Sequence, residues 1–389
     1  MLISSEYVTL GHPDRLCDTI AANLISRIQK KDGLSSHAAV EVFASNDTVI
    51  FGGEVKTSLK INKKLLKEVL EESFNDCGYI KERRDFFTKN EVYLAKDTKI
   101  INKIHAQSPD IAIATTDKSE DSGFNDQGIF FGAYDSLTPT GQGMAKFLAQ
   151  SFGDYLFKKS FVDYRIGSDI KTVFTLNISD EDFYTPLSIE HITVAIPNKN
   201  IDDINKYVKT EYEEWKKEIG KYKTLTKILK SKPKFTVNGT GRYICHGYHS
   251  DASMTGRKLA VNNMSAGPIY SQCQCGGSSY IKPFHASDFL LPMAGNMIAK
   301  KIVDSGLTPY ANVALACTIG AKKVDSICIT GDEKFNANKK QLNKLIKEFT
   351  ELNLSPKGLL NLWKDDFNFY EITKNNFVGD SCPWFKKFS

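Results

Sequence analysis

The sequence has few of the features that mark a membrane, secreted or nucleic-acid-binding protein. No apolar run reaches the length needed to span a bilayer. The first residues lack the basic and apolar segments of a secretory leader, so we expect no signal peptide. The 51 basic and 46 acidic residues give a formal net charge of only +5, and no dense Lys/Arg block indicates nucleic acid as a partner. We therefore expect a cytoplasmic protein that binds neither a membrane nor nucleic acid.

Closely spaced cysteines are also scarce. Of the eight cysteines, only Cys273 and Cys275 lie close together in sequence. A structural zinc site needs a second such pair, which is missing. We therefore expect free thiols in a reducing compartment, and we expect Cys17 to contribute packing and not nucleophilic chemistry.

The 389-residue chain is too long for one ordinary core, so we expect two or three domains. Strand-like runs come in hairpin pairs, as in 38–44 and 48–51, and alternate with amphipathic helices. This pattern favours an α+β architecture over a doubly wound parallel sheet. Further strands are predicted at 91–94, 172–176, 191–196, 312–317 and 326–330. Helices are predicted at 62–74, 141–158, 201–219, 286–304, 336–352 and 356–363.

The stretch Gly11–Asp18 places an imidazole, a carboxylate and a guanidinium at the start of a predicted helix. Pro13 suits the first helical position. Behind it, the apolar residues of an amphipathic helix recur every four positions, at Leu16, Ile20, Leu24 and Ile28. His12 and Asp14 are therefore expected at the helix N-terminus, which favours anions, and Asp14 can also hold a hard cation such as Mg²⁺. The stretch suits a phosphate–magnesium ligand; a solvated capping segment is the alternative.

Two further stretches are candidates for a binding site. Residues 107–128 form some twenty residues of polar, glycine-containing chain, which is typical of a gating loop or a linker. Residues 238–258 combine glycines with arginines and a lysine, as a phosphate cradle does, and Tyr243 suits stacking on a purine. Neither a P-loop nor a dinucleotide fingerprint is present. A glycine-rich hairpin with surface arginines is the alternative for the second stretch.

Taken in order, these motifs resemble those of the S-adenosylmethionine synthetase (methionine adenosyltransferase) family. The matching motifs are Gly11–Asp14, Gly52–Glu54, Gln107–Asp110, Asp126–Gly128, Thr240–Tyr243, Thr255–Lys258 and the closing Pro383–Trp384. One such motif would be weak evidence. Seven in the same order, spread over nearly the whole chain, identify a divergent member of the family.

The resemblance implies an α+β fold of three similar αβ domains around a pseudo-threefold axis, with sheets inside and helices outside. We accordingly expect an N-terminal domain at 1–106, a flexible active-site loop at 107–125, a central domain at 126–234 and a C-terminal domain at 235–389. The family resemblance also implies a homodimer with active sites at the subunit interface, possibly assembled as a dimer of dimers. The implied reaction converts ATP, L-methionine and water into S-adenosylmethionine, phosphate and diphosphate.

The resemblance also implies roles for individual residues. It places the catalytic groups at the triphosphate: His12, Lys171, Arg257, Lys258 and Lys282. It implies ATP contacts from His12, Asp169, Ile170, Lys171, Arg242, Tyr243, Asp251, Arg257, Lys258, Ser278 and Lys282. It implies methionine contacts from Glu54, Gln107, Asp126, Asp251 and Ile319. It implies two Mg²⁺ per site, held by Asp14 and Asp288, and K⁺ held by Glu41; from its position in the strand alone, Glu41 reads as a solvent-facing residue.

This residue set agrees with the chemistry of the reaction. A thioether sulfur has no proton to lose, so its attack on C5′ of ATP needs no general base. The triphosphate leaving group must instead accept charge, which requires positioning and electrostatic stabilisation by cations in a dry site. The loop from Gln107 would exclude water once both substrates are bound.

The sequence departs from the family in several places. The family run Lys-Asp-Pro-Ser-Lys-Val-Asp-Arg-Ser corresponds to 282–290, where Ala286 replaces a lysine and Phe289 an arginine. These changes remove two positive charges from the expected site, for which His285 is a partial substitute. Arg15 replaces a usual lysine, and Asn125 a usual glycine. Two alternatives therefore stay open: a catalytically impaired nucleotide-binding or regulatory paralogue, and an ATP or triphosphate hydrolase.

Overall fold

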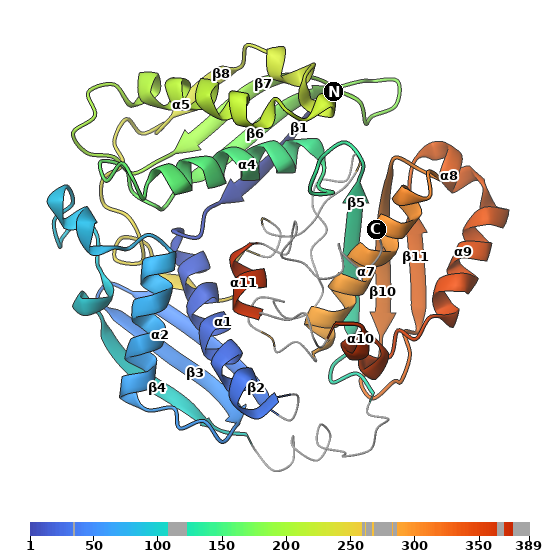
Figure 1. Ribbon diagram of the computed structural model, residues 1–389, viewed down its shortest axis with the longest axis horizontal. Helices are drawn as coiled ribbons and strands as arrows, with labels where there is room; N and C mark the ends of the chain where they lie inside the picture. Colours follow the sequence, from blue (N-terminus) through green and yellow to red (C-terminus); the bar gives the residue numbers. More distant parts are fainter. Residues whose placement is uncertain are drawn as a thin grey trace.

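The computed structural model describes residues 1–33, 36–107, 123–258, 261, 267, 282, 286–363 and 369–375. Its strands form three sheets, each packed against helices (Figure 1). The expected α+β class is therefore confirmed. Short 3₁₀ helices connect some of these elements, at Lys81–Asp85, Ala95–Asp97, Lys223–Leu225 and Ile228–Lys230. None of the helices in the described ranges is both long enough and apolar enough to cross a membrane.

The first sheet, called the β6 sheet, has the order β1-β6-β7-β8. Its strands are β1 (Leu2–Val8), β6 (Lys171–Ile178), β7 (Pro186–Ala195) and β8 (Lys234–Val237). Side chains of β6 alternate between buried and partly exposed, as expected for a sheet with one face in the core. Two helices cover that face, α4 (Met144–Lys159) and α5 (Ile204–Ile219). Phe152 of α4 lies 5.1 Å from Trp215 of α5, measured between ring centroids.

The second sheet, called the β2 sheet, has the order β4-β3-β2-β9. Its strands are β2 (His37–Ser45), β3 (Thr48–Lys56), β4 (Lys99–Ala106) and β9 (Ser253–Met254). Helices α1 (Pro13–Asp32) and α2 (Lys63–Asp76) pack on it. The first two strands form the hairpin that the sequence predicts, with Ser45 opposite Thr48.

The third sheet, called the β10 sheet, has the order β11-β10-β5. Its strands are β5 (Gly128–Asp135), β10 (Tyr310–Cys317) and β11 (Ser326–Thr330). Its helices are α7 (Ser287–Asp304), α8 (Glu333–Ala337), α9 (Lys339–Glu351) and α10 (Pro356–Trp363). Helix α7 approaches β5 closely because both elements have a glycine at the contact: a Cβ on Gly132 would lie 2.1 Å from the Gly295 carbonyl carbon.

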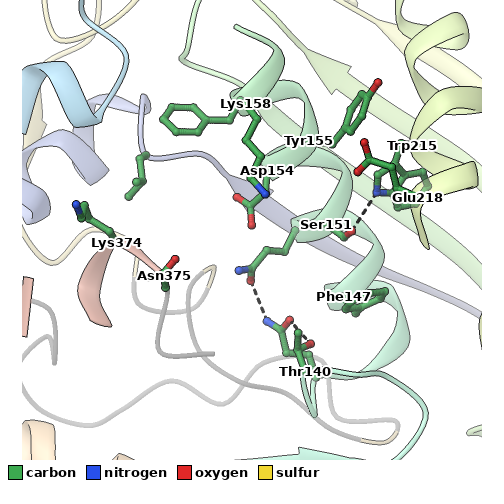
Figure 2. A pocket seen from close by; sticks show the side chains of 14 residues that line it. Thr140, Phe147, Ser151, Asp154, Tyr155, Lys158, Trp215, Glu218, Lys374 and Asn375 are labelled. Atoms are coloured by element: carbon green, nitrogen blue, oxygen red, sulfur yellow. Dashed lines mark hydrogen bonds between the residues drawn. The ribbon is translucent and has the colours of Figure 1, made fainter. Parts of the chain in front are cut away.

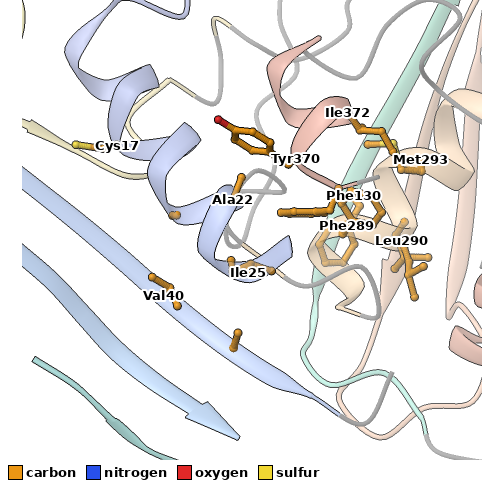
Figure 3. Close-up of a cluster of buried hydrophobic side chains, with 14 of the residues drawn as sticks. Cys17, Ala22, Ile25, Val40, Phe130, Phe289, Leu290, Met293, Tyr370 and Ile372 are labelled. Carbon is orange, nitrogen blue, oxygen red and sulfur yellow. The ribbon is translucent and has the colours of Figure 1, made fainter. Parts of the chain in front are cut away.

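One detail of the layer order differs from the expectation of sheets inside and helices outside. Helices α1, α4 and α7 lie on the side of their sheets that faces the middle of the molecule, near the short helix α11 (Phe369–Lys374) (Figure 1). The reason is a shared core. Phe289 of α7 packs 5.4 Å from Phe369 of α11, and the same buried cluster includes Tyr370 and the α1 residue Ile25 (Figure 3).

Most expected helices and strands are present, with boundaries moved by a few residues. The strand predicted at 91–94 is wrong, because this segment is a turn whose carboxylate Glu91 accepts the backbone N–H of Thr88. The expected domain limits stay predictions. Each sheet takes one strand from a distant part of the chain: β1 pairs with β6, β5 with β10, and β9 with β2.

Candidate active site

The N-terminus of α1 has the local geometry that the sequence predicts. Pro13 is its first helical residue, and His12 is the N-cap, whose Nδ1 accepts the backbone N–H of Asp14 at 3.1 Å. Gly11 is required because a Cβ there would lie 2.2 Å from the Ser168 carbonyl oxygen. His12 and Asp14 are both buried, at 2% exposure each. They therefore form an enclosed helix terminus and not a solvated cap.

Strand pairing brings residues 169–171 to this terminus. Val8, the last residue of β1, lies opposite Lys171, the first residue of β6. The chain continues this contact beyond the sheet, since Thr9 N donates to the Ile170 carbonyl at 3.0 Å and Ile170 N donates to Thr9 Oγ1 at 3.1 Å. Lys171 consequently lies close enough to His12 to lower the pKa of its imidazole.

The segment Met254–Lys258 supplies two more cations to the same place. Lys258 Nζ lies 2.6 Å from Asp14 Oδ2, and Arg257 Nη1 lies 3.5 Å from Asp14 Oδ1. The backbone N–H of Met254 donates to Asp14 Oδ1 at 3.0 Å. The structure thus brings together His12, Asp14, Lys171, Arg257 and Lys258, whose roles stay predictions from the resemblance.

These surroundings fix the charge state of His12. Burial, and then the nearby Lys171, Lys258, Arg15 and Arg257, hold its pKa well below the usual range for histidine. The imidazole is therefore neutral at physiological pH. Because Nδ1 accepts a hydrogen bond from Asp14, the neutral ring carries its proton on Nε2. His12 can donate that proton in a hydrogen bond to an oxygen acceptor.

Asp169 lies beside this group and joins it to Tyr243. Its Oδ2 accepts the Tyr243 hydroxyl at 2.8 Å and the Gly247 N–H at 3.2 Å. Its Oδ1 is buried without a hydrogen-bond partner in the described part of the chain. Burial raises the pKa of Asp169 to about 6. The exposed Asp251 lies near enough to contribute to that rise, so three of the expected nucleoside contacts are neighbours.

Glu41, Glu54 and Gln107 are placed on the β2 sheet. Glu41 lies opposite Gly52 in the sheet, and Glu54 follows Gly52 by two residues. Because residues two apart in a strand lie on the same face, both carboxylates share one face of the sheet. Thr255 Oγ1 donates to Glu41 Oε2, which connects this face to the segment with the two cations. Gln107 N donates to the Val55 carbonyl at 3.0 Å, and its buried side-chain oxygen has no hydrogen-bond partner among the described residues.

A second group of expected site residues lies at the β10 sheet. Asp126 precedes β5 and Ile319 follows β10, at the end where Gly128 pairs with Cys317. Asp288 is buried in the first turn of α7. Asn125, which replaces the usual glycine, has a structural role here. Its side-chain oxygen accepts the Ser287 N–H at 2.8 Å and so caps α7. Asp126, Asp288 and Ile319 lie at the β10 sheet and α7, whereas the group around His12 lies at the start of α1 and β6.

The two positions that depart most from the family are core positions. Ala286 is the N-cap residue of α7 and is 1% exposed, and Phe289 is fully buried against Phe369. Neither replaces the lost cation with another charge. Lys282 is half-buried and forms no hydrogen bond or ion pair with described residues, Arg242 is exposed, and Ser278 and His285 lie outside the described residues.

A cavity of about 530 Å³ lies elsewhere in the described part of the chain. Its walls come from α4, α5 and α11, and Asp154, Trp215 and Lys374 are among the residues that line it (Figure 2). It contains none of the expected site residues. The candidate site is therefore recognised from the convergence of side chains and not from this cavity.

Sequence reasoning missed Asp18, which lies one helical turn after Asp14. Asp18 Oδ1 accepts the Gly256 N–H at 2.9 Å, so it touches the same segment as Asp14. The i, i+4 spacing of the two aspartates on the predicted helix was the available signal. Burial raises the pKa of Asp18 to about 6.

Two family models match this chain. The model described as "S-adenosylmethionine synthetase, N-terminal domain" matches residues 1–109, and "S-adenosylmethionine synthetase, C-terminal domain" matches residues 245–386. Together they cover both the α1 terminus and the segment Met254–Lys258.

Curated relatives and a solved structure agree with these matches. The chain is 27% identical to S-adenosylmethionine synthase 2 of Rhodospirillum rubrum over 370 residues, covering 92% of this chain and 86% of the relative. It is 28% identical to the S-adenosylmethionine synthase of Petrotoga mobilis over 368 residues, covering 90% and 86%. An unusual S-adenosylmethionine synthetase from Campylobacter jejuni shares the fold, with a TM-score of 0.84, 24% identity and coverage of 100% of this chain and 97% of the other.

Proposed function

The chain belongs to the S-adenosylmethionine synthetase family, and on that premise we propose that it makes S-adenosylmethionine from ATP and L-methionine. The methionine sulfur attacks C5′ of ATP, the C5′–O bond breaks, and the released triphosphate is hydrolysed to phosphate and diphosphate. The observation that carries the proposal is the convergence of His12, Lys171, Arg257 and Lys258 at the N-terminus of α1.

The charge states of these residues suit the departure of a polyphosphate. Neutral His12 donates its Nε2 proton in a hydrogen bond to an oxygen of the leaving group. Lys171, Arg257 and Lys258 stabilise the negative charge that this group gains in the transition state. Lys282 is proposed to join them. Because the cations are already in place before the reaction, little reorganisation is needed as the charge develops.

Asp169 and Tyr243 are proposed to bind the nucleoside, with Ile170, Arg242, Asp251 and Ser278. The free Oδ1 of Asp169 is a buried acceptor that a ribose hydroxyl or an amine can satisfy. Methionine is proposed to contact Glu54, Gln107, Asp126, Asp251 and Ile319. The Glu54 carboxylate suits the ammonium group, and the buried Gln107 oxygen is a further acceptor.

The donor set is compatible with the metals that the family resemblance implies. The described residues include no group of three His, Cys, Asp or Glu side chains that could hold a metal ion. Mg²⁺, however, is usually held by one or two carboxylates together with substrate phosphates. Asp14 and Asp288 are proposed to supply such carboxylates, and Glu41 an oxygen for K⁺. Bound Mg²⁺ would supply charge neutralisation for the polyphosphate.

A second copy of the chain is proposed to complete the active site. The expected residues form two groups on different elements, one around His12 at the start of α1 and one around Asp288 on α7 and the β10 sheet. In a homodimer with active sites at the interface, alone or within a dimer of dimers, the His12 group of one copy would lie beside the Asp288 group of its partner. Apolar side chains on the helix-free faces of the sheets support such an interface, since Phe43, Met254 and Ile129 are 41%, 44% and 44% exposed.

The impaired paralogue is the second candidate. The observation that favours it is that Ala286 and Phe289 are buried and uncharged. The positive charges of the family lysine and arginine at these two positions are therefore absent. Such a protein would bind the nucleotide and release no product.

One assay separates the candidates. The protein is incubated with ATP, Mg²⁺ and K⁺, with and without L-methionine, while S-adenosylmethionine and phosphate are measured. We expect S-adenosylmethionine only when methionine is present. Nucleotide binding without turnover would identify the paralogue, and phosphate release without methionine would identify a hydrolase.

A further inference from the structure

The segment that carries Arg257 and Lys258 is held from two sides. On one side, Thr255 N donates to the Val42 carbonyl of β2 at 3.0 Å, and Val42 N donates to Thr255 Oγ1 at 3.3 Å. On the other side, Met254 N donates to Asp14 and Gly256 N donates to Asp18, both on α1. The position of the two cations relative to α1 therefore depends on two carboxylates, one of which is expected to bind metal.

Asp18 has the properties of a fixed anchor. It is 1% exposed, and Arg15, which is fully buried, donates to its Oδ2 at 3.5 Å. Arg15 in turn donates to the Thr373 carbonyl of α11 at 3.0 Å. A buried carboxylate is costly unless it is hydrogen-bonded and paired, and here both partners are present. The arginine that replaces the family lysine at position 15 thus joins α11 to the anchor through two separate nitrogens.

We propose that Asp18 is a positioning residue for the phosphate site: it fixes the backbone at Gly256 so that Arg257 and Lys258 stay at the N-terminus of α1. Gly256 has a φ of +79°, a conformation that glycine adopts readily and most other residues do not. The hydrogen bond from its N–H to Asp18 holds this turn in place. The inference rests on the proposed function, because it presumes that the two cations bind polyphosphate.

Two substitutions at Asp18 separate positioning from a general loss of stability. Asp18→Ala removes the acceptor of the Gly256 N–H, whereas Asp18→Asn keeps an oxygen that can accept it. Asp135→Ala is the matched control. Asp135 is also 1% exposed and also accepts backbone N–H groups, from Leu137 at 2.8 Å and Gly267 at 3.1 Å, but it belongs to β5.

Isothermal titration calorimetry of the full-length protein measures its affinity for inorganic tripolyphosphate in the presence of Mg²⁺. We expect Asp18→Ala to bind about tenfold more weakly or worse, the loss typical of one hydrogen bond to a charged group. Asp18→Asn and Asp135→Ala should stay within about twofold of the unsubstituted protein. Hydrogen exchange at the Gly256 amide should accelerate in Asp18→Ala and not in Asp18→Asn.

The outcomes are distinguishable. Unchanged binding by Asp18→Ala, or an equal loss in Asp135→Ala, would overturn the positioning role while leaving the proposed function intact. No tripolyphosphate binding by the unsubstituted protein would overturn both. If Asp18→Ala does not fold, Asp18→Glu replaces it, because the added methylene displaces the carboxylate from Gly256; tight binding by that folded variant would equally overturn the role.

Discussion

Lys171 has a structural role in strand pairing and a proposed chemical role beside His12. As the first residue of β6 it pairs with Val8, and this pairing brings its charge beside His12. We expect Lys171→Ala to lower the rate of S-adenosylmethionine formation by about 10²–10³-fold, since it removes one preorganised charge from the leaving group. Lys234→Ala is the control, because Lys234 is likewise the first residue of a strand in the same sheet. Near-normal turnover by Lys171→Ala would remove it from the mechanism.

His246 makes stability depend on pH. It is fully buried between Phe87 and Tyr79, and burial lowers its pKa to about 3, whereas the pKa of a histidine in the unfolded chain is about 6.5. Between these values the unfolded state binds the extra proton, so stability rises with pH and is lost as the pH falls below about 6.5.

The corresponding variant is His246→Phe, which keeps an aromatic ring and cannot be protonated. Lowering the pH from 7 to 5 should narrow the difference in free energy of unfolding between the two proteins by about 2 kcal/mol. Urea denaturation at both values measures it, with His105→Phe, on the exposed part of β4, as the control. A difference that does not change with pH would show that His246 is not the titrating group.

At the scale of elements, α7 depends on a residue far away in sequence. Its N-cap, Ala286, has no side-chain oxygen, and Asn125 supplies one to the Ser287 N–H. We expect Asn125→Ala to lower the free energy of unfolding by about 1 kcal/mol. Asn62→Ala calibrates the effect, because Asn62 caps α2 through the Leu65 N–H at 3.0 Å. A loss in Asn62→Ala with none in Asn125→Ala would contradict the capping role.

Helices and strands with a strong apolar periodicity were predicted well from the sequence. Strands that form only because a distant segment pairs with them were predicted poorly. The hairpin of β2 and β3 and the helices α2 and α10 follow from apolar spacing and turn residues. Strands β1, β4, β5, β8 and β9 were not predicted. The partners of β1, β5 and β9 lie far away in sequence, and β4 and β8 each pair with a parallel neighbour. Among the site residues, motif resemblance predicted His12 and Lys258, which the structure places near each other. It did not identify Asp18, whose role depends on a contact 238 residues away.

In the molecule as a whole, the sheet faces opposite the helices carry exposed apolar side chains. Phe43 of β2 and Met254 of β9 are opposite each other in the sheet, and both are more than 40% exposed. Glu41, two residues before Phe43 on the same strand, belongs to the expected site, and Thr255, next to Met254, donates a hydrogen bond to Glu41. A second copy docked on this face would bury the apolar pair and close the site in one step, which favours a dimer as the active form.

We therefore expect Phe43→Glu combined with Met254→Glu to shift the protein from dimer to monomer and to abolish S-adenosylmethionine formation, because two buried, unpaired carboxylates are incompatible with an apolar contact. Sedimentation velocity measures the assembly and the methionine-dependent assay the activity. Val162→Glu is the control, since Val162 is 75% exposed but follows α4 outside any sheet. A double variant that remained dimeric and active would place the interface elsewhere. A monomeric variant with full activity would instead show that one chain holds a complete site, and the residues around Asp288 would then need another role.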